Sequence, residues 1–112
     1  MATGGATQFL HVSEETLAAY RGSRNLLGVQ FSDGNWYYPG RQFVTKPYPH
    51  VVEGLKEVLD AFVAAGTEEP DVWATWLAGL LEADVTMWDA LRAGRVEEVA
   101  LQAGRDSRWW RS

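Results

Sequence analysis

Cysteine is absent from this sequence of 112 residues, and only two histidines, His11 and His50, are present. Without cysteine the chain forms no disulfide, thiol nucleophile or cysteine-ligated metal centre. Neither histidine has a second ligand at a useful spacing, so we expect no metal site. No apolar run approaches the roughly 18–20 residues that a membrane span needs, and the first residues lack the pattern of a signal peptide. These absences predict a soluble cytoplasmic protein that binds neither metal nor membrane.

Catalytic motifs are also missing. The sequence has no Gly-x-Ser-x-Gly nucleophile elbow and no glycine-rich loop that leads into Lys-Ser or Lys-Thr. Two carboxylate pairs are present, Glu68-Glu69 and Glu97-Glu98. Adjacent side chains on a helix point apart, and acidic residues suit the first turn of a helix. We therefore expect no enzyme activity and no cofactor.

The formal net charge is −5, and it is unevenly distributed. Residues 53–98 contain eleven acidic and three basic side chains, whereas residues 99–112 contain three arginines and one aspartate. An acidic body repels the phosphates of nucleic acid, so we expect no nucleic-acid binding by the chain alone. The simplest interpretation of the acid excess is a solvated surface that keeps the protein soluble.

Three segments are expected along the chain. Small and polar residues at the start predict a flexible N-terminus over residues 1–12. A single domain follows over residues 13–104, and residues 105–112 form a C-terminal tail. Ser13 is a suitable N-cap for a short first helix, which we expect to end near Gly22.

The strand signals lie in the first half of the domain. Residues 26–31 and 36–38 have strand character and flank the turn dipeptide Asp33-Gly34, a combination typical of a β-hairpin. Residues 42–44 form another short extended segment. The aromatic residues here pack in the core of a small sheet, or alternatively stack on single-stranded nucleic acid, although only Arg41 and Lys46 lie nearby to support the second interpretation.

Helical spacing of apolar residues begins after residue 48. Pro49 suits the first turn of a helix and Gly66 its end. A second helix is predicted from Pro70, with an apolar stripe made of Trp73, Trp76, Leu77, Leu80 and Leu81. The pattern as a whole predicts an α+β, mainly helical fold, in which a small antiparallel β-hairpin is followed by three or four packed helices.

Two further helices are predicted near the C-terminus. Thr86 and Asp89 have the spacing of a capping box at the start of a third helix, which ends at Gly94. The fourth helix runs from about Arg95 to Gly104. Its narrow stripe of small apolar residues, Val96, Val99, Ala100 and Ala103, suits close packing against another surface.

The C-terminal tail contains Trp109 and Trp110, flanked by Arg108 and Arg111. Tryptophan and arginine are the residue types that dominate binding hot spots. Contact with a partner is therefore the preferred interpretation of the tail. Folding back onto Trp88 and a disordered tail remain as alternatives.

A set of motifs in order along residues 26–104 resembles the toxin-binding domain of the Xre/MbcA/ParS-type antitoxins. These motifs are a Leu-Leu-Gly-Val strand at 26–29, a tyrosine–proline pair, a Gln-Phe pair, a Trp-Leu helix and a Thr-led short helix with a Leu-x-x-Gly ending. Their signature residues are Tyr38, Pro39, Gln42, Phe43, Trp76, Leu77, Thr86, Leu91 and Gly94.

The sequence departs from the family at three places. Met87 stands where the family often has proline after the threonine, and residues 81–84 lack the usual glycine. Only 25 residues precede Leu26, too few for the helix-turn-helix domain that many members carry. Specific duplex DNA binding is therefore not expected.

The resemblance implies a function. It implies an antitoxin that binds a RES-domain toxin, a protein that consumes NAD by hydrolysis or phosphorolysis, and that covers the toxin's active site with its C-terminal part. It also implies self-association, here as a homodimer. The rival hypothesis is an orphan protein-interaction module with a different partner or a self-assembly role. The candidate toxin-binding residues are Val96, Val99, Ala100, Ala103, Arg105, Arg108, Trp109, Trp110 and Arg111.

Overall fold

The computed structural model describes the backbone of residues 1–111 and the side chains of residues 1–109. This part of the chain contains the helices α1 (Thr3–Leu10), α2 (Glu14–Gly22), α3 (Leu55–Ala64), α4 (Pro70–Leu77), α5 (Met87–Arg92) and α6 (Val96–Arg111), and a short 3-10 helix, η1 (Gly40–Gln42). Three antiparallel pairs of strands complete it: β1 (Val29–Gln30) with β2 (Trp36–Tyr37), β3 (Phe43–Val44) with β4 (His50–Val51), and β5 (Leu80–Glu82) with β6 (Val85–Thr86).

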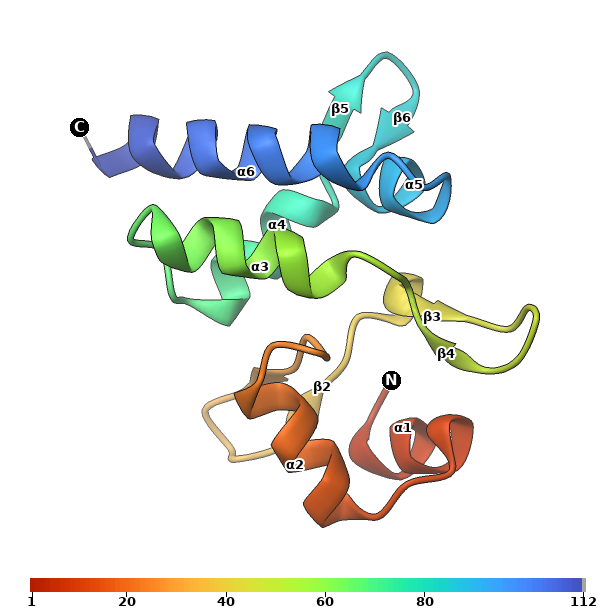
Figure 1. Ribbon diagram of the computed structural model, residues 1–112. Helices are drawn as coiled ribbons and strands as arrows, with labels where there is room; N and C mark the ends of the chain where they lie inside the picture. The colour runs from red at the N-terminus through yellow and green to blue at the C-terminus, as the bar shows by residue number, and fades with distance from the viewer. Residues whose placement is uncertain (112) are drawn as a thin grey trace.

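The predicted class, α+β and mainly helical, is confirmed. The order of elements differs from the prediction, because two helices precede the first hairpin and the strands form three small sheets. In Figure 1, α6 lies along α3, and the unit of α1 and α2 lies on the opposite side of α3.

Two hydrophobic clusters divide the interior. The smaller one joins α1, α2 and β2 through Ala6, Leu17, Leu26, Tyr38 and Phe43, and the larger one fills the space among α3, α4, α5 and α6. Leu26 belongs to the smaller cluster and its neighbour Leu27 to the larger one, because successive side chains of extended backbone point in opposite directions. Residues 26–28 are therefore the seam between the two clusters.

Gln42 holds this seam together. Its side chain is fully buried, and its Nε2 donates hydrogen bonds to the carbonyl oxygens of Leu27 (2.8 Å) and Pro39 (3.1 Å). Its Oε1 accepts from the N–H of Leu27 at 2.9 Å, and its own carbonyl accepts from the N–H of Val52 at 2.7 Å. One glutamine thus replaces the backbone partner that a neighbouring strand would give Leu27.

The flexible N-terminus predicted over residues 1–12 is wrong, because this segment forms α1. Ala6 is fully buried, and the ring of Phe9 meets that of Phe43 edge to face at 5.2 Å. The N–H of Tyr38 donates to the Met1 carbonyl at 2.7 Å, which adds a backbone bond between this segment and the end of β2. These tertiary contacts offset the low helix propensity of a segment with two glycines.

The start of the long helical region was also misplaced. Pro49 does not begin a helix, because His50 and Val51 form β4 and pair with β3 in the register Phe43↔Val51. The helix α3 begins only after Gly54, whose backbone is left-handed with φ 89°. The pairing with β3, which ends six residues before His50, makes this segment a strand. Helical spacing alone does not reveal such a partner.

Leu80 and Leu81, predicted on the stripe of the second helix, lie in β5 instead. Leu81 packs against the core, whereas Leu80 is 64% exposed, so the alternation has the period of a strand. The turn to β6 contains Asp84 in left-handed conformation, with φ 63°. The formation of this hairpin ends α4 at Leu77.

The local capping signals were predicted correctly. The Ser13 Oγ accepts from the N–H of Thr16 at 3.1 Å and begins α2. Thr86 and Asp89 form the predicted capping box of α5, in which the Asp89 N–H donates to the Thr86 hydroxyl oxygen and the Thr86 N–H donates to the Asp89 carboxylate. Hydrogen bonding from Thr86 to the Asp89 carboxyl lowers the pKa of that group. Gly94 follows α5 with φ 84°, as expected for the end of that helix.

Replacing Gln42 by leucine should destabilise the domain by about 3 kcal/mol, because the variant leaves the buried N–H and C=O of Leu27 without partners. Urea unfolding followed by circular dichroism measures this change. The matched control is Gln8→Leu on the exposed side of α1, which should change stability by less than about 0.5 kcal/mol. Similar losses for the two variants would contradict the role given to Gln42.

Candidate protein-binding surface

The helix α6 extends well beyond its predicted end. Gly104 lies inside it, and residues 105–111 continue the helix in place of the predicted tail. Two tertiary contacts hold this extension. The indole Nε1 of Trp76 donates to the Asp106 carboxylate at 2.8 Å, and the buried hydroxyls of Ser107 and Thr67 share a hydrogen bond. These contacts outweigh the roughly 1 kcal/mol that a glycine costs within a helix.

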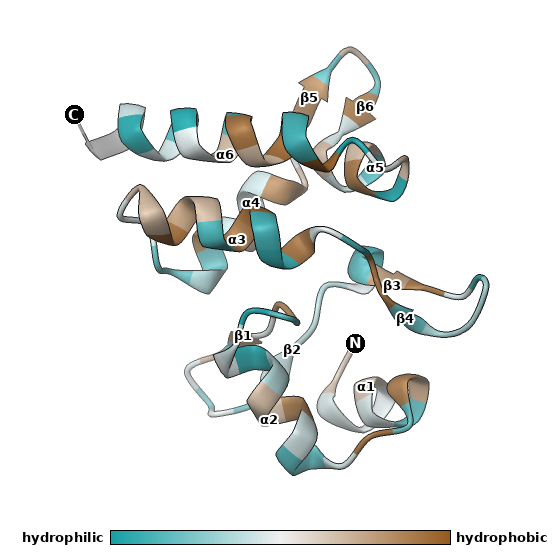
Figure 2. Cartoon of the chain, in the orientation of Figure 1, coloured by the Kyte–Doolittle hydropathy of each residue, from teal (hydrophilic) through white to brown (hydrophobic). Residues whose placement is uncertain are grey.

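The inner face of α6 packs inside the domain. Val99, Ala103 and Ser107 follow at intervals of four residues, and all are fully buried. They lie on the side of α6 that contacts α3, and hydrophobic and hydrophilic residues alternate along both helices in Figure 2. Val96 and Ala100 are half-buried against the same core. The small apolar stripe therefore meets the chain's own α3, and in this fold it is not available to a partner.

The outer face of α6 consists of Leu101, Arg105, Arg108 and Trp109, which are all exposed. Their spacing places them along one side of the helix, over about two turns. Leu101 is 54% exposed and Trp109 is 75% exposed, so two large apolar side chains flank two arginines. The exposure of Trp109 excludes the alternative in which it folds back into the core beside Trp88.

Three of these exposed residues, Arg105, Arg108 and Trp109, were predicted from the sequence as candidate binding residues, and Leu101 was not. The signal for Leu101 was its position off the stripe of small residues, where a leucine has no internal contact to make. Trp110 and Arg111, the other predicted tail residues, belong to α6 by their backbone, and their side chains lie outside the described residues.

Arg95 fixes the start of α6. Its guanidinium pairs with Glu98 in the first turn at 2.7 Å and with Glu82 of β5 at 2.5 Å. The hydrogen bond from Arg95 lowers the pKa of Glu98, and the bonds to Glu98 and Glu82 raise the pKa of Arg95. This arginine holds the β5–β6 hairpin against α6, which helps to orient the helix.

The signature residues of the sequence motifs support the fold and do not form a site. All of them except Thr86 and Gly94 are buried, and those two cap and terminate α5. Tyr38 and Phe43 fill the smaller cluster, and the other apolar ones fill the larger cluster or line the seam. The set is Tyr38, Pro39, Gln42, Phe43, Trp76, Leu77, Thr86, Leu91 and Gly94.

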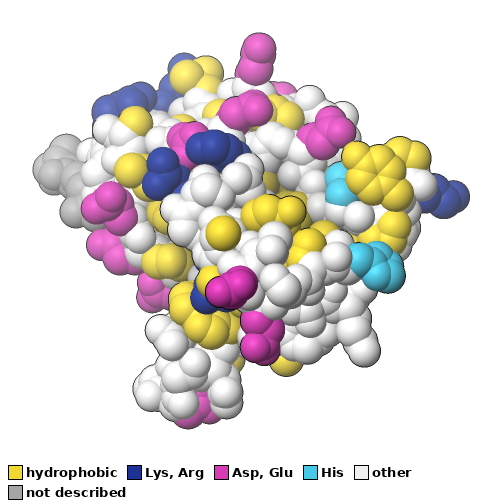
Figure 3. All heavy atoms as spheres, turned by 60° about the horizontal axis from the view of Figure 1, so that its bottom comes forward, with side chains coloured by type: hydrophobic (Ala, Val, Ile, Leu, Met, Phe, Trp, Pro, Cys, Tyr) yellow, Lys and Arg dark blue, Asp and Glu magenta, His cyan; other side chains and the backbone are white. Residues whose placement is uncertain are grey.

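The described residues contain neither a candidate metal cluster nor a candidate membrane-spanning helix. No cluster of three or more histidine, aspartate or glutamate side chains suited to a metal ion occurs there. None of the helices in that part has the length and apolarity needed to cross a membrane. On the face shown in Figure 3, acidic and basic side chains are interspersed and apolar atoms form separate small patches.

Comparisons with protein-family models, with curated proteins and with solved structures gave no match for this chain.

The position of α6 depends on Gly54. A Cβ at this residue would collide with the methyl groups of Val96 at the start of α6, and the left-handed backbone already disfavours any side chain. Gly54→Ala should therefore destabilise the domain by about 3 kcal/mol, from backbone strain and overpacking together. Urea unfolding measures this difference.

Gly34→Ala is the matched control for the strain component. Its φ of 88° is nearly the same as that of Gly54, but nothing lies within 4 Å of the added Cβ. This variant should lose only about 1 kcal/mol. Equal losses of stability in the two variants would show that the close approach of Val96 to Gly54 contributes nothing to the effect of Gly54→Ala.

Proposed function

We propose that this chain is a non-enzymatic cytoplasmic antitoxin that binds a RES-domain, NAD-consuming toxin and covers its active site with the outer face of α6. The observation that carries the proposal is the set of exposed Leu101, Arg105, Arg108 and Trp109 on one side of a well-anchored helix. A tryptophan that is 75% exposed loses favourable burial in the free protein and regains it in a complex. The antitoxin itself requires no cofactor.

The identity of the proposed partner rests on the resemblance to the Xre/MbcA/ParS-type antitoxins. One structural feature supports it. The Gln-Phe motif and the Leu-Leu-Gly-Val motif are separate segments, and Gln42 binds the backbone of Leu27, 15 residues earlier, through both of its side-chain polar atoms. The two motifs therefore act as one structural unit, which gives a physical reason for their joint occurrence.

The chemistry of the outer face suits occlusion of a nucleotide-binding cleft. A tryptophan can fill space that otherwise receives a nicotinamide or adenine ring, and the two arginines require acidic groups around that cleft. Because Asp106 and Ser107 anchor the helix beside these residues, little conformational entropy is lost on binding.

A second candidate function is self-assembly, with or without a different partner. Phe31 and Tyr37 on the β1–β2 hairpin are both exposed, and their rings stack at 6.0 Å with an angle of 18° between planes. Such a pair provides an apolar contact for a second copy, as in the predicted homodimer. Light scattering of wild type and of Phe31→Ser tests this, because a dimer built on the hairpin dissociates in the variant.

Trp109→Ala should strongly weaken neutralisation of the proposed RES-domain toxin while leaving the fold intact. If Trp109 is a hot spot, the loss in binding is about 2–4 kcal/mol, or roughly 30- to 1,000-fold in affinity. Growth rescue and titration calorimetry measure the effect. A point substitution is preferable to deletion of residues 105–112, because deletion also removes Asp106 and Ser107 from their contacts with Trp76 and Thr67.

The matched control is Tyr48→Ala, which removes an aromatic side chain that is 63% exposed in the loop between β3 and β4. This variant should neutralise the toxin as well as the wild type does. Full neutralisation by Trp109→Ala, with or without Leu101→Ser, would remove the outer face of α6 from the mechanism.

A further inference from the structure

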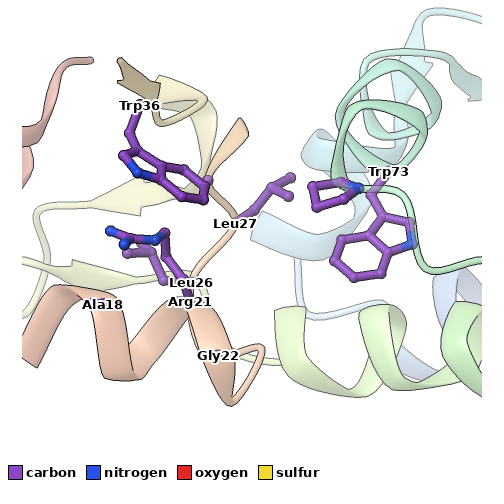
Figure 4. A pocket seen from close by; sticks show the side chains of 9 residues that line it. Ala18, Arg21, Gly22, Leu26, Leu27, Trp36 and Trp73 are labelled. Carbon is purple, nitrogen blue, oxygen red and sulfur yellow. The ribbon is translucent and has the colours of Figure 1, made fainter. Parts of the chain in front are cut away.

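Some glycines of this fold stand where a side chain would not fit, and Gly28 is one of them. It lines the pocket of about 310 Å³ drawn in Figure 4, where the guanidinium of Arg21 lies 3.9 Å from the centre of the Trp36 ring. A Cβ at Gly28 would stand 2.8 Å from the Arg21 Cδ and 2.9 Å from the Tyr38 ring. The packing of the chain itself therefore accounts for this glycine.

Gly104 is different, because the fold does not require a glycine there. Its backbone is not left-handed, and it lies in the interior of α6, where glycine is less favourable than alanine. The three atoms nearest to an added Cβ, at 3.3, 3.8 and 3.9 Å, all belong to the guanidinium of Arg108. Because Arg108 is an exposed and flexible side chain, no fixed part of the chain excludes a methyl group at Gly104.

The missing side chain leaves a notch in the outer face of α6, between Leu101 and Arg108 and with Gly104 at its base. Leu101 stands three residues before Gly104 and Arg108 four residues after it, so all three share one side of the helix. Gly104 is buried in the free protein, and the guanidinium of Arg108 covers it. None of the ion pairs among the described residues involves Arg108, so an acidic group of a partner can draw this guanidinium away.

We propose that Gly104 is the point at which the partner approaches the backbone of α6 most closely. An acidic side chain of the partner pairs with Arg108 and moves its guanidinium off the notch, and partner atoms then pack directly on Gly104. Glycine permits such an approach, and the packed atoms gain van der Waals contact. This inference rests on the proposed function, because the partner is the proposed RES-domain toxin.

Gly104→Ala separates the stability of the chain from its binding. Alanine favours the helix, so the melting temperature of the free chain should rise by about 4 °C. The affinity for the proposed RES-domain toxin, measured by titration calorimetry, should fall at least about tenfold, because the added methyl group holds the partner away from α6. A residue that serves only the fold would not change stability and affinity in opposite directions.

Gly22→Ala is the matched control. Gly22 is the exposed last residue of α2, and nothing lies within 4 Å of an added Cβ. This variant should melt at or above the temperature of the wild type and should bind the toxin with unchanged affinity.

A double variant tests whether Gly104 acts only through Arg108. A glycine that merely positions the guanidinium has no further effect once Arg108→Ala has removed it. Close approach of the partner predicts instead that Gly104→Ala still lowers affinity about tenfold in the Arg108→Ala background.

Three results would overturn the inference: a lower melting temperature of Gly104→Ala, an unchanged affinity for the toxin, or a loss of affinity that disappears in the Arg108→Ala background. An unchanged affinity of Gly104→Ala beside a weakened Trp109→Ala rejects the role of Gly104 and leaves the proposed function standing. Absence of toxin binding by the wild-type chain rejects both.

Discussion

The hydrogen bonds between Gln42 and Leu27 are the constraint on which the rest of this structure depends. Leu27 faces the larger hydrophobic cluster and Leu26 the smaller one, so their shared backbone passes between the two and lacks a strand partner on this side. The Gln42 amide supplies both the donor and the acceptor that this backbone needs. Because its own carbonyl binds the N–H of Val52, the same residue also positions the approach to α3.

The parts of the fold that could be predicted from the sequence are those decided within a few residues. Ser13 and Thr86 cap their helices through atoms three residues away, and Gly94 ends α5 through its own backbone conformation. The errors lie where a distant partner decides. Val51 lies in a strand because it pairs with Phe43. No local feature of the sequence around Val51 favours this strand over a helix.

In the candidate site, too, the features set by nearby residues could be predicted from the sequence, and those set by distant contacts could not. The sequence predicted a C-terminal helix and included three of its exposed residues among the candidate binding residues, but the stripe of small residues that it also assigned to partner contact packs inside the domain. A stripe of small residues lets two helices approach closely, and this property does not reveal whether the second helix belongs to the same chain. Only the burial of Val99 and Ala103 beside α3 answers that question.

The continuation of α6 through Gly104 lowers the entropy cost of forming the proposed complex. A disordered tail would lose conformational entropy when it ordered on a toxin, and its affinity would fall accordingly. In this fold that ordering occurs during folding, because Trp76 holds Asp106 and Thr67 holds Ser107. In the proposed complex, the inner face of α6 therefore influences the affinity of the outer face without touching the partner. Substitutions that loosen the inner contacts act on binding through the fraction of molecules whose last turns are helical.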